Sequence, residues 1–314
     1  MSLKKIMVAS TALCILLLIY LIPSNGEEFK FKEKNVTYVQ NNTKETIYLL
    51  DKNDYVARTS IATCNCDVRD KAMELTEGLI IGGKKSDIIP SGFRSIIPPA
   101  VSILAVELVE GTLTIDFSRD LLDVNPKYEE KMIEAIVYTL TSLDGIDNVR
   151  ILVEGEALNK LPKMDKALDV VLDKSIGINK VYALTSPKDV ISYTVYYVSK
   201  NSDYYYVPVT KYVNNVGSDK IKLIINSLAT SFTYESNLMS FLNSDVELLD
   251  YKLDNDSISL NFNDMILDDI GKNNILEEVI YTICLSLEDN FDVKEVTFTA
   301  NNEKISTISL KMLD

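Results

Sequence analysis

Histidine and tryptophan are both absent from the 314 residues of this chain. The lack of histidine excludes the side chain that most often acts as a general base at neutral pH, and with it the Ser-His-Asp and Cys-His nucleophile systems. It also removes the commonest zinc ligand. Catalysis by carboxylates or lysine remains open in principle, but the sequence singles out no such pair. The sequence therefore offers no catalytic, cofactor-binding or metal-binding residues, and we expect no cofactor.

Cysteine is scarce as well, with four residues in the chain. Cys14 lies inside an apolar run and follows Leu13, where a lipidation site requires a small residue, so we expect no lipid there. Cys64 and Cys66 form a C-x-C, and Cys284 lies on an apolar segment with helical spacing. These thiols are too few for a disulfide framework, and a C-x-C metal or redox site would need partners that the sequence does not show. We interpret Cys64 and Cys66 as a loop feature and Cys284 as a core thiol.

Positive charge is in the minority, with a formal net charge of −14 and an isoelectric point of about 4.6. Nucleic-acid binding relies on Lys and Arg to neutralise phosphates, so this balance argues against a nucleic-acid partner. It also disfavours docking on anionic lipid headgroups. We interpret the acidic charge as a source of solubility. The hydrophobic fraction of 46% is high enough for real cores, and the length suggests about two domains.

The N-terminus carries the one long apolar run. Lys4 and Lys5 precede residues 6–22, which would span slightly less than a hydrocarbon core as a helix. Two interpretations remain open. The run is either an uncleaved signal anchor with the lysines inside, or a signal peptide cleaved after the small residues at 24–26. The length of the run favours the anchor, and both interpretations place residues 27–314 outside the cytoplasm.

The rest of the chain contains an internal repeat. Residues 106–155 and 251–302 both read as strand, tight turn, strand, helix and strand. Glu110-Gly111 and Asn255-Asp256 fall at the same turn of the two hairpins. An internal repeat indicates duplication of one structural unit, which suggests a scaffold rather than one catalytic cleft.

An apolar helix follows each hairpin. We expect these helices over residues 128–143 and 274–287, because their apolar residues recur at helical spacing along one stripe. Tyr138-Thr139-Leu140 in the first copy matches Tyr281-Thr282-Ile283 in the second. Each helix leads into a further strand, which completes the unit.

These patterns predict an α+β fold, with the helices of each copy on one face of a small sheet. Phe117 and Phe262, which end the two hairpins, should pack under the helices. An uncovered sheet face or edge would remain available for a partner. The expected layout is a signal anchor or signal peptide over 1–26, a tether over 27–45, a first domain over 46–155, a linker over 156–180 with a short helix at 167–172, and a second domain over 181–314.

The first copy resembles a known domain. Residues 104–118 resemble the signature hairpin of the GerM domain, and residues 135–141 and 148–155 resemble its helix and closing strand. Residues 27–314 as a whole resemble a tandem pair of GerM domains, a family of sporulation and spore germination proteins in endospore-forming bacteria. The second copy diverges, because it lacks a Pro-rich entry segment like that at 90–99 and ends in Asn301-Asn302 rather than Glu-Gly.

The resemblance implies a non-enzymatic, extracytoplasmic role. GerM domains are similar to ring-building modules of the apparatus between mother cell and forespore. We therefore expect a sporulation scaffold, held at the membrane through residues 6–22, whose partners are other envelope or sporulation-complex proteins, with self-assembly into rings. Neither the identity of the partner nor the contact surface follows from the sequence.

Two other functions are compatible with parts of the sequence. The first is a cell-wall or small-ligand binding module, because tyrosine faces can stack on sugars. The tyrosines concerned are Tyr193, Tyr196, Tyr197, Tyr204, Tyr205, Tyr206 and Tyr212. The second is a calcium site or acid-dependent hydrolase at Asp264, Asp268 and Asp269, but this run lacks the glycine and distal glutamate of an EF-hand loop. The preference of tyrosine for strands explains the tyrosines more simply. A solvated turn explains the three aspartates more simply.

Overall fold

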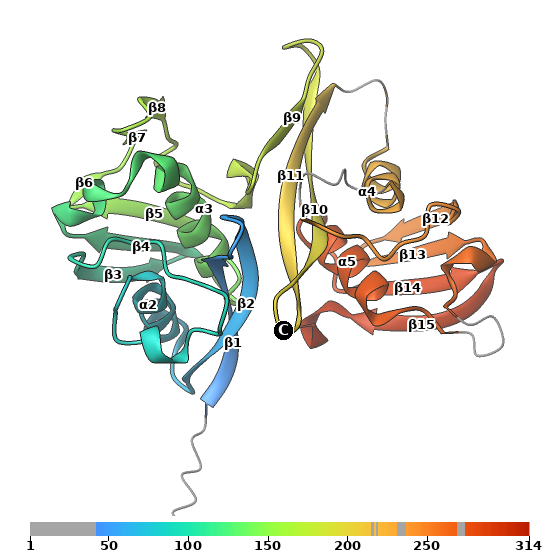
Figure 1. Ribbon diagram of the computed structural model, residues 1–314, viewed down its shortest axis with the longest axis horizontal. Helices are drawn as coiled ribbons and strands as arrows, with labels where there is room; N and C mark the ends of the chain where they lie inside the picture. Colours follow the sequence, from blue (N-terminus) through green and yellow to red (C-terminus); the bar gives the residue numbers. More distant parts are fainter. Residues whose placement is uncertain (1–41, 215–216, 218, 231–236, 269–273, 314) are drawn as a thin grey trace, which may run out of the picture. The chain divides into compact units, whose positions relative to one another are not determined.

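The computed structural model describes residues 42–214, 217, 219–230, 237–268 and 274–313 (Figure 1). Two repeats share one element order, which is hairpin, helix, hairpin, helix and strand pair. The first repeat contains β1 (Asn42–Leu50), β2 (Val56–Cys64), α2 (Val68–Leu79), β3 (Ile103–Val109), β4 (Thr112–Phe117), α3 (Glu129–Leu140), β5 (Asn148–Val153) and β6 (Glu156–Ala157). The second contains β10 (Val190–Lys200), β11 (Tyr204–Asn214), α4 (Lys220–Ala229), β12 (Leu248–Asp254), β13 (Ser257–Phe262), α5 (Glu277–Glu288), β14 (Glu295–Ala300) and β15 (Glu303–Ser309).

A connector of residues 158–189 joins the repeats. It holds the short strands β7 (Lys160–Leu161), β8 (Lys166–Ala167) and β9 (Val181–Ala183). Short 3-10 turns occur at Ser86–Ile88, Arg119–Asp123, Pro126–Tyr128, Lys174–Ile176, Asp264–Ile266 and Leu310–Met312. The predicted α+β class is confirmed by this arrangement.

Buried and partly exposed residues alternate along the central strands of the two four-stranded sheets. β4 and β13 place every second residue in the core, so one face of each four-stranded sheet packs on helices. Phe117 and Phe262 are fully buried there, as predicted. In both sheets the central pair is parallel, because a helix connects its two strands. The first hairpins of the two repeats share a separate sheet of order β1-β2-β11-β10, with β9 paired to β11.

The helices lie between two layers of strands. In the first repeat, α3 contacts β1 on one side and β5 on the other, with α2 alongside (Figure 1). In the second repeat, α5 and α4 contact each other and β10. This coverage buries α3 almost all round, from Met132 to Leu140. The single apolar stripe predicted from the sequence is too narrow, because periodicity could not show that a hairpin covers the second side of the helix.

The structure corrects the match between the apolar helices. The backbone N–H of Tyr48 on β1 donates to Thr139 Oγ1 on α3 at 2.9 Å, and that of Tyr196 on β10 donates to Ser286 Oγ on α5 at 2.8 Å. Ser286 is therefore the counterpart of Thr139, and Tyr196 that of Tyr48. The predicted match to Thr282 is wrong by one helical turn, a distance at which apolar spacing repeats.

The predicted helix at residues 167–172 is also wrong. This stretch is extended, and Leu172 exchanges two backbone hydrogen bonds of 2.8 Å with Val149 on β5. Leu172 and Leu161 are buried in the same cluster as α3. The connector therefore satisfies its backbone groups on the sheet instead of within a helix.

Cys64 and Cys66 are joined by a disulfide at the end of β2. This bond was not expected from the sequence, and it forms because the chain turns there and brings the two Cα atoms to 5.3 Å. Cys284 is a buried free thiol, as predicted. The apolar run at 6–22 lies outside the described residues. Within the part of the chain that the structure describes, no helix is long and apolar enough to cross a membrane.

Candidate functional site between the two repeats

The two repeats meet through like strands, β2 and β11. Tyr206 on β11 pairs with Arg58 on β2 in an antiparallel bridge. Tyr48 pairs with Arg58 in the first hairpin, and its counterpart Tyr196 pairs with Pro208 in the second, so Arg58 and Pro208 are counterparts. By the same count Tyr206 corresponds to Val56, two residues before Arg58. The pairing is therefore centred on Ala57 and its counterpart Val207, and both are fully buried. Like surfaces thus face each other about a local two-fold axis, as in an isologous dimer.

A connector asparagine completes this strand contact. The Asn179 amide donates to Val56 O and to Pro208 O, both at 2.8 Å, while its Oδ1 accepts from the Val56 N–H at 3.0 Å. Pro208 has no N–H to offer a neighbouring strand. Asn179 therefore supplies polar partners at a place where regular pairing between β2 and β11 is broken, and it keeps this buried backbone satisfied.

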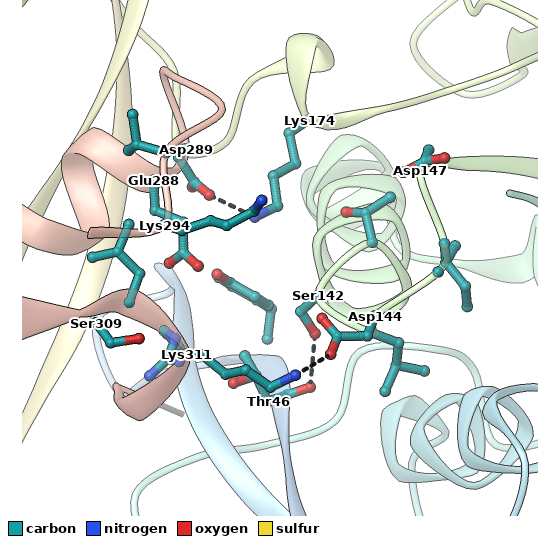
Figure 2. A pocket seen from close by; sticks show the side chains of 18 of the residues that line it. Thr46, Ser142, Asp144, Asp147, Lys174, Glu288, Asp289, Lys294, Ser309 and Lys311 are labelled. Carbon is teal, nitrogen blue, oxygen red and sulfur yellow. Dashed lines mark hydrogen bonds and ion pairs between the residues drawn. The ribbon is translucent and has the colours of Figure 1, made fainter. Parts of the chain in front are cut away.

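A buried polar cluster adjoins the strand contact. The Tyr196 hydroxyl donates to Asp289 Oδ2 at 2.7 Å and accepts from the Tyr48 hydroxyl at 2.8 Å. Lys174 Nζ from the connector lies 2.5 Å from Asp289 Oδ1 (Figure 2). The Asp289 side chain is only 2% exposed. One carboxylate thus gathers both repeats and the connector onto a single charge-assisted network.

The surroundings fix the protonation states of this cluster. Burial raises the pKa of the Tyr48 phenol to about 12, and the Asp289 carboxylate adds to the shift. Burial and Asp289 also raise the pKa of Tyr196 well above its ordinary range. Burial alone would lower the pKa of Lys174, but attraction to Asp289 raises it overall. At neutral pH Lys174 is therefore positively charged, and Tyr48 and Tyr196 are neutral hydroxyl donors.

A second cross-repeat contact involves Asp51, which is fully buried after β1. Its Oδ1 accepts from the backbone N–H groups of Asn53 and Tyr55, each at 2.8 Å, and shapes the turn. Its Oδ2 accepts from the Tyr205 hydroxyl of the second repeat at 2.8 Å. The turn of one repeat is thus held by a side chain of the other.

A polar cavity of about 590 Å³ opens beside the cluster, lined by residues of both repeats. Tyr48, Tyr196, Lys174 and Asp289 form part of its wall. At the exposed side, Lys311 and Asp144 form an ion pair of 3.2 Å across the repeats (Figure 2). The volume suits a small molecule. Both acidic side chains, such as Asp147, and basic side chains line the cavity, so it does not strongly favour a ligand of either charge.

Most of the candidate binding residues predicted from the sequence do not line this cavity. Of the seven tyrosines, four are buried core residues, and Tyr196 alone reaches the cavity wall. These four are Tyr193, Tyr196, Tyr197 and Tyr205. The other three each pack against an aromatic ring, in the pairs Tyr204–Phe241, Tyr206–Tyr281 and Tyr212–Tyr182.

The acidic run after β13 is likewise separate from the cavity. Asp264 accepts a hydrogen bond from the Asn301 side-chain amide at 2.6 Å. Asp268 is exposed, and Asp269 lies outside the described residues. Among the residues that the structure describes, no group of three Cys, Asp or Glu could hold a metal ion. Burial raises the pKa of the Cys284 thiol, which leaves it protonated and a poor nucleophile at neutral pH.

Sequence reasoning missed the ion pair at the centre of the inter-repeat cluster. Asp289 follows directly after a helix end and reads as a solvated carboxylate, and Lys174 lies in the predicted linker. Neither residue has a local pattern that marks it. Their pairing depends on contacts between segments that are distant in the sequence.

Comparison with known proteins agrees with the duplicated architecture. A family model described as "Germane: Sporulation and spore germination" matches residues 37–159 and 194–306. The chain belongs to the Germane family. The two matched segments correspond to the two repeats, and the resemblance to GerM domains drawn from the sequence is confirmed.

Two relatives of this Germane protein are informative. The chain is 31% identical over 265 residues to the spore germination protein GerM of Bacillus subtilis (strain 168). The aligned segment covers 82% of this chain and 71% of that protein. The solved tandem GerMN domains of the sporulation protein GerM from Bacillus subtilis superpose with a TM-score of 0.78 at 29% identity. That match covers 85% of this chain and 96% of the solved one. The paired arrangement of repeats is therefore similar to that of a known sporulation protein.

Proposed function

We propose that this Germane protein is a non-enzymatic, extracytoplasmic assembly protein of spore formation. It helps to build or position an envelope-spanning complex between mother cell and forespore, with a further role in germination. The observation that carries this proposal is the coupling of two like modules into one unit by Asn179 and the Lys174–Asp289 cluster. The similarity to a sporulation protein over both repeats supports the same role.

The geometry suits assembly for a physical reason. An isologous contact is closed, because each repeat uses the same surface to meet the other. Partners must therefore bind to surfaces that point away from β2 and β11, and the coupled repeats present two such sets of surfaces at a fixed spacing. As an uncleaved anchor, residues 6–22 hold the chain at the membrane; as a signal peptide cleaved near Gly26, they leave it secreted.

Deletion of the gene in its own host tests the assembly role. We expect fewer heat-resistant spores, with collapsed or small forespores after engulfment. A wild-type copy should restore the count. Normal spores that also germinate normally would contradict the proposal. Extraction of membranes at alkaline pH tests the tether, because an anchored chain stays in the pellet and a cleaved chain is released.

A cell-wall or small-ligand binding module is the second candidate, and the inter-repeat cavity of about 590 Å³ favours it. Co-sedimentation of the purified chain with isolated cell wall tests this function. Pelleting that is lost when Lys311 and Asp144 at the cavity are both replaced by alanine would support it. Absence of pelleting would contradict it and leave the assembly role as stated.

A further inference from the structure

A groove runs between α2 and the edge strand β3 in the first repeat. β3 ends the sheet order β3-β4-β5-β6, so one side of its backbone faces away from the ladder. The groove has a volume of about 280 Å³. Two large apolar side chains line it and remain accessible, Met73 at 40% and Leu104 at 53%. The other lining residues are Arg69, Asp70, Ile103, Ala105 and Val106.

Leu104 is placed in the groove by a β-bulge. The pairing of β3 with β4 shifts between Ile103 and Ala105, so Leu104 is the extra residue on the edge strand. β12 in the second repeat has the same shift at the counterpart position, and the extra residue there is Leu249, 50% exposed. A bulge re-aims the side chain that it carries. Both repeats therefore direct a leucine outward from the edge of the sheet.

The second repeat has an additional contact at the corresponding place. Tyr251 on β12 donates its hydroxyl to the carboxylate of Asp219, the residue that caps α4. This bond ties the edge strand to the helix. Val106 occupies the place of Tyr251 in the first repeat, and it has no hydroxyl to reach Asp67, the capping residue of α2. The two repeats thus differ at this place: Tyr251 bridges the edge strand to the helix cap in the second repeat, and Val106 provides no such bridge in the first.

The edge beside the groove is acidic. Glu107 and Glu110 are exposed on and after β3, and among the described residues neither forms an ion pair. Arg69 and Asp70 at the other rim face each other at 3.4 Å and largely cancel. An occupant that places basic side chains toward solvent at β3 would therefore gain attraction along the edge.

We propose that this groove binds an extended segment of a partner protein, which adds as a strand to β3. Its aliphatic side chains would enter the groove against Met73 and Leu104, and its alternate Lys or Arg residues would face Glu107 and Glu110. Backbone hydrogen bonds supply affinity in such strand addition, and the pocket for alternate side chains supplies specificity. This inference goes beyond the proposed assembly role, because binding can be measured whether or not spore formation depends on it.

A fluorescent peptide of alternating valine and lysine tests the proposal. Its anisotropy is measured against the full chain, purified in a non-ionic detergent. Three peptides serve as controls: one with the same residues in two blocks, one of alternating valine and glutamate, and one with proline at the central valine. We expect saturable binding of the first peptide only. The proline peptide should fail because it cannot donate a ladder hydrogen bond at that position.

Three variants locate the binding. Leu104→Asp should weaken it by about tenfold or more, since a charge replaces an aliphatic side chain that the bound peptide would bury. Val106→Tyr should weaken it by closing the groove toward Asp67. Leu249→Asp is the matched control, a similarly exposed bulge leucine in the repeat where Tyr251 bonds the edge strand to the helix cap, and should leave binding unchanged. All three variants should keep the far-ultraviolet circular dichroism of the wild type.

Several results would overturn the proposal. Among these are no saturable binding, equal binding of the valine–glutamate peptide, and equal binding by the wild type and Leu104→Asp. An equal loss in Leu249→Asp would show binding to bulged leucines in general rather than to the groove. Self-association of the chain that depends on Leu104 and excludes the peptide would mean that the occupant is a second copy, contrary to the partner segment proposed.

Discussion

Replacement of Lys174 by methionine should destabilise the contact between the repeats. Methionine keeps much of the aliphatic length of lysine but removes the charge next to Asp289. The Asp289 carboxylate, only 2% exposed, would then keep the Tyr196 hydroxyl as a partner and lose its ion pair with Lys174. Removing one partner of a buried ion pair costs about 3–5 kcal/mol. Lys174 itself is 28% exposed, so water can reach part of the site and we expect the lower end, about 3 kcal/mol.

A second substitution separates charge from packing. Asp289→Asn in the Lys174→Met background keeps an oxygen that accepts from Tyr196, but it removes the unpaired charge. We therefore expect the double variant to regain about 2 kcal/mol, a coupling in the range seen for residues in contact. Lys311→Met is the control, because it removes an exposed pair with Asp144 and should leave stability nearly unchanged.

Urea unfolding of the purified variants measures these differences. Tyrosine fluorescence and circular dichroism both report on unfolding, since the chain has no tryptophan. The free energy of unfolding and its urea dependence should be obtained for each variant. A loss below about 1 kcal/mol in Lys174→Met, or simple additivity with Asp289→Asn, would refute the view that a buried charge pair couples the repeats.

Three further predictions concern the core, the strand contact and pH. Phe117→Ala should lower the free energy of unfolding by about 3–5 kcal/mol as a truncation of a fully buried aromatic residue, and a loss under about 1 kcal/mol in urea would contradict the core assignment. Asn179→Ala should cost about 3 kcal/mol by leaving backbone groups of Val56 and Pro208 unsatisfied, and faster hydrogen exchange at Val56 should accompany it. The raised pKa of Tyr48 contributes stability that is complete below pH about 10 and is lost as pH rises toward 12. Tyr48→Phe should therefore flatten that alkaline limb, and an unchanged limb would show that this residue does not contribute to it.

Much of the fold was predictable because it is local. The hairpin turns at Glu110-Gly111 and Asn255-Asp256 fall between alternating strands, and residues 110, 111 and 255 have positive φ. Both apolar helices occur where their spacing indicates, and Phe117 and Phe262 are buried at the ends of β4 and β13. Each of these features depends on residues close together in the chain, and the sequence displays them as periodicity and turn chemistry.

The candidate site was not predictable in the same way. Tyr48, Lys174, Tyr196 and Asp289 come from four different segments, and none has a flanking pattern that marks a buried polar role. Register errors also pass unnoticed in a helix, where apolar residues recur every turn, and this is why Thr282 was matched to Thr139.

The sequence by itself determined a duplicated α+β chain without histidine chemistry, because composition and short-range periodicity suffice for that. Only the tertiary structure decided that the repeats meet through like strands around Ala57 and Val207, and that Tyr251 ties the edge strand of the second repeat to the cap of α4. The physical reason is that the free energy of a polar group depends far more on its burial than on the residues next to it in the sequence. A carboxylate such as Asp289 becomes a structural centre when a distant strand and a connector lysine remove it from water.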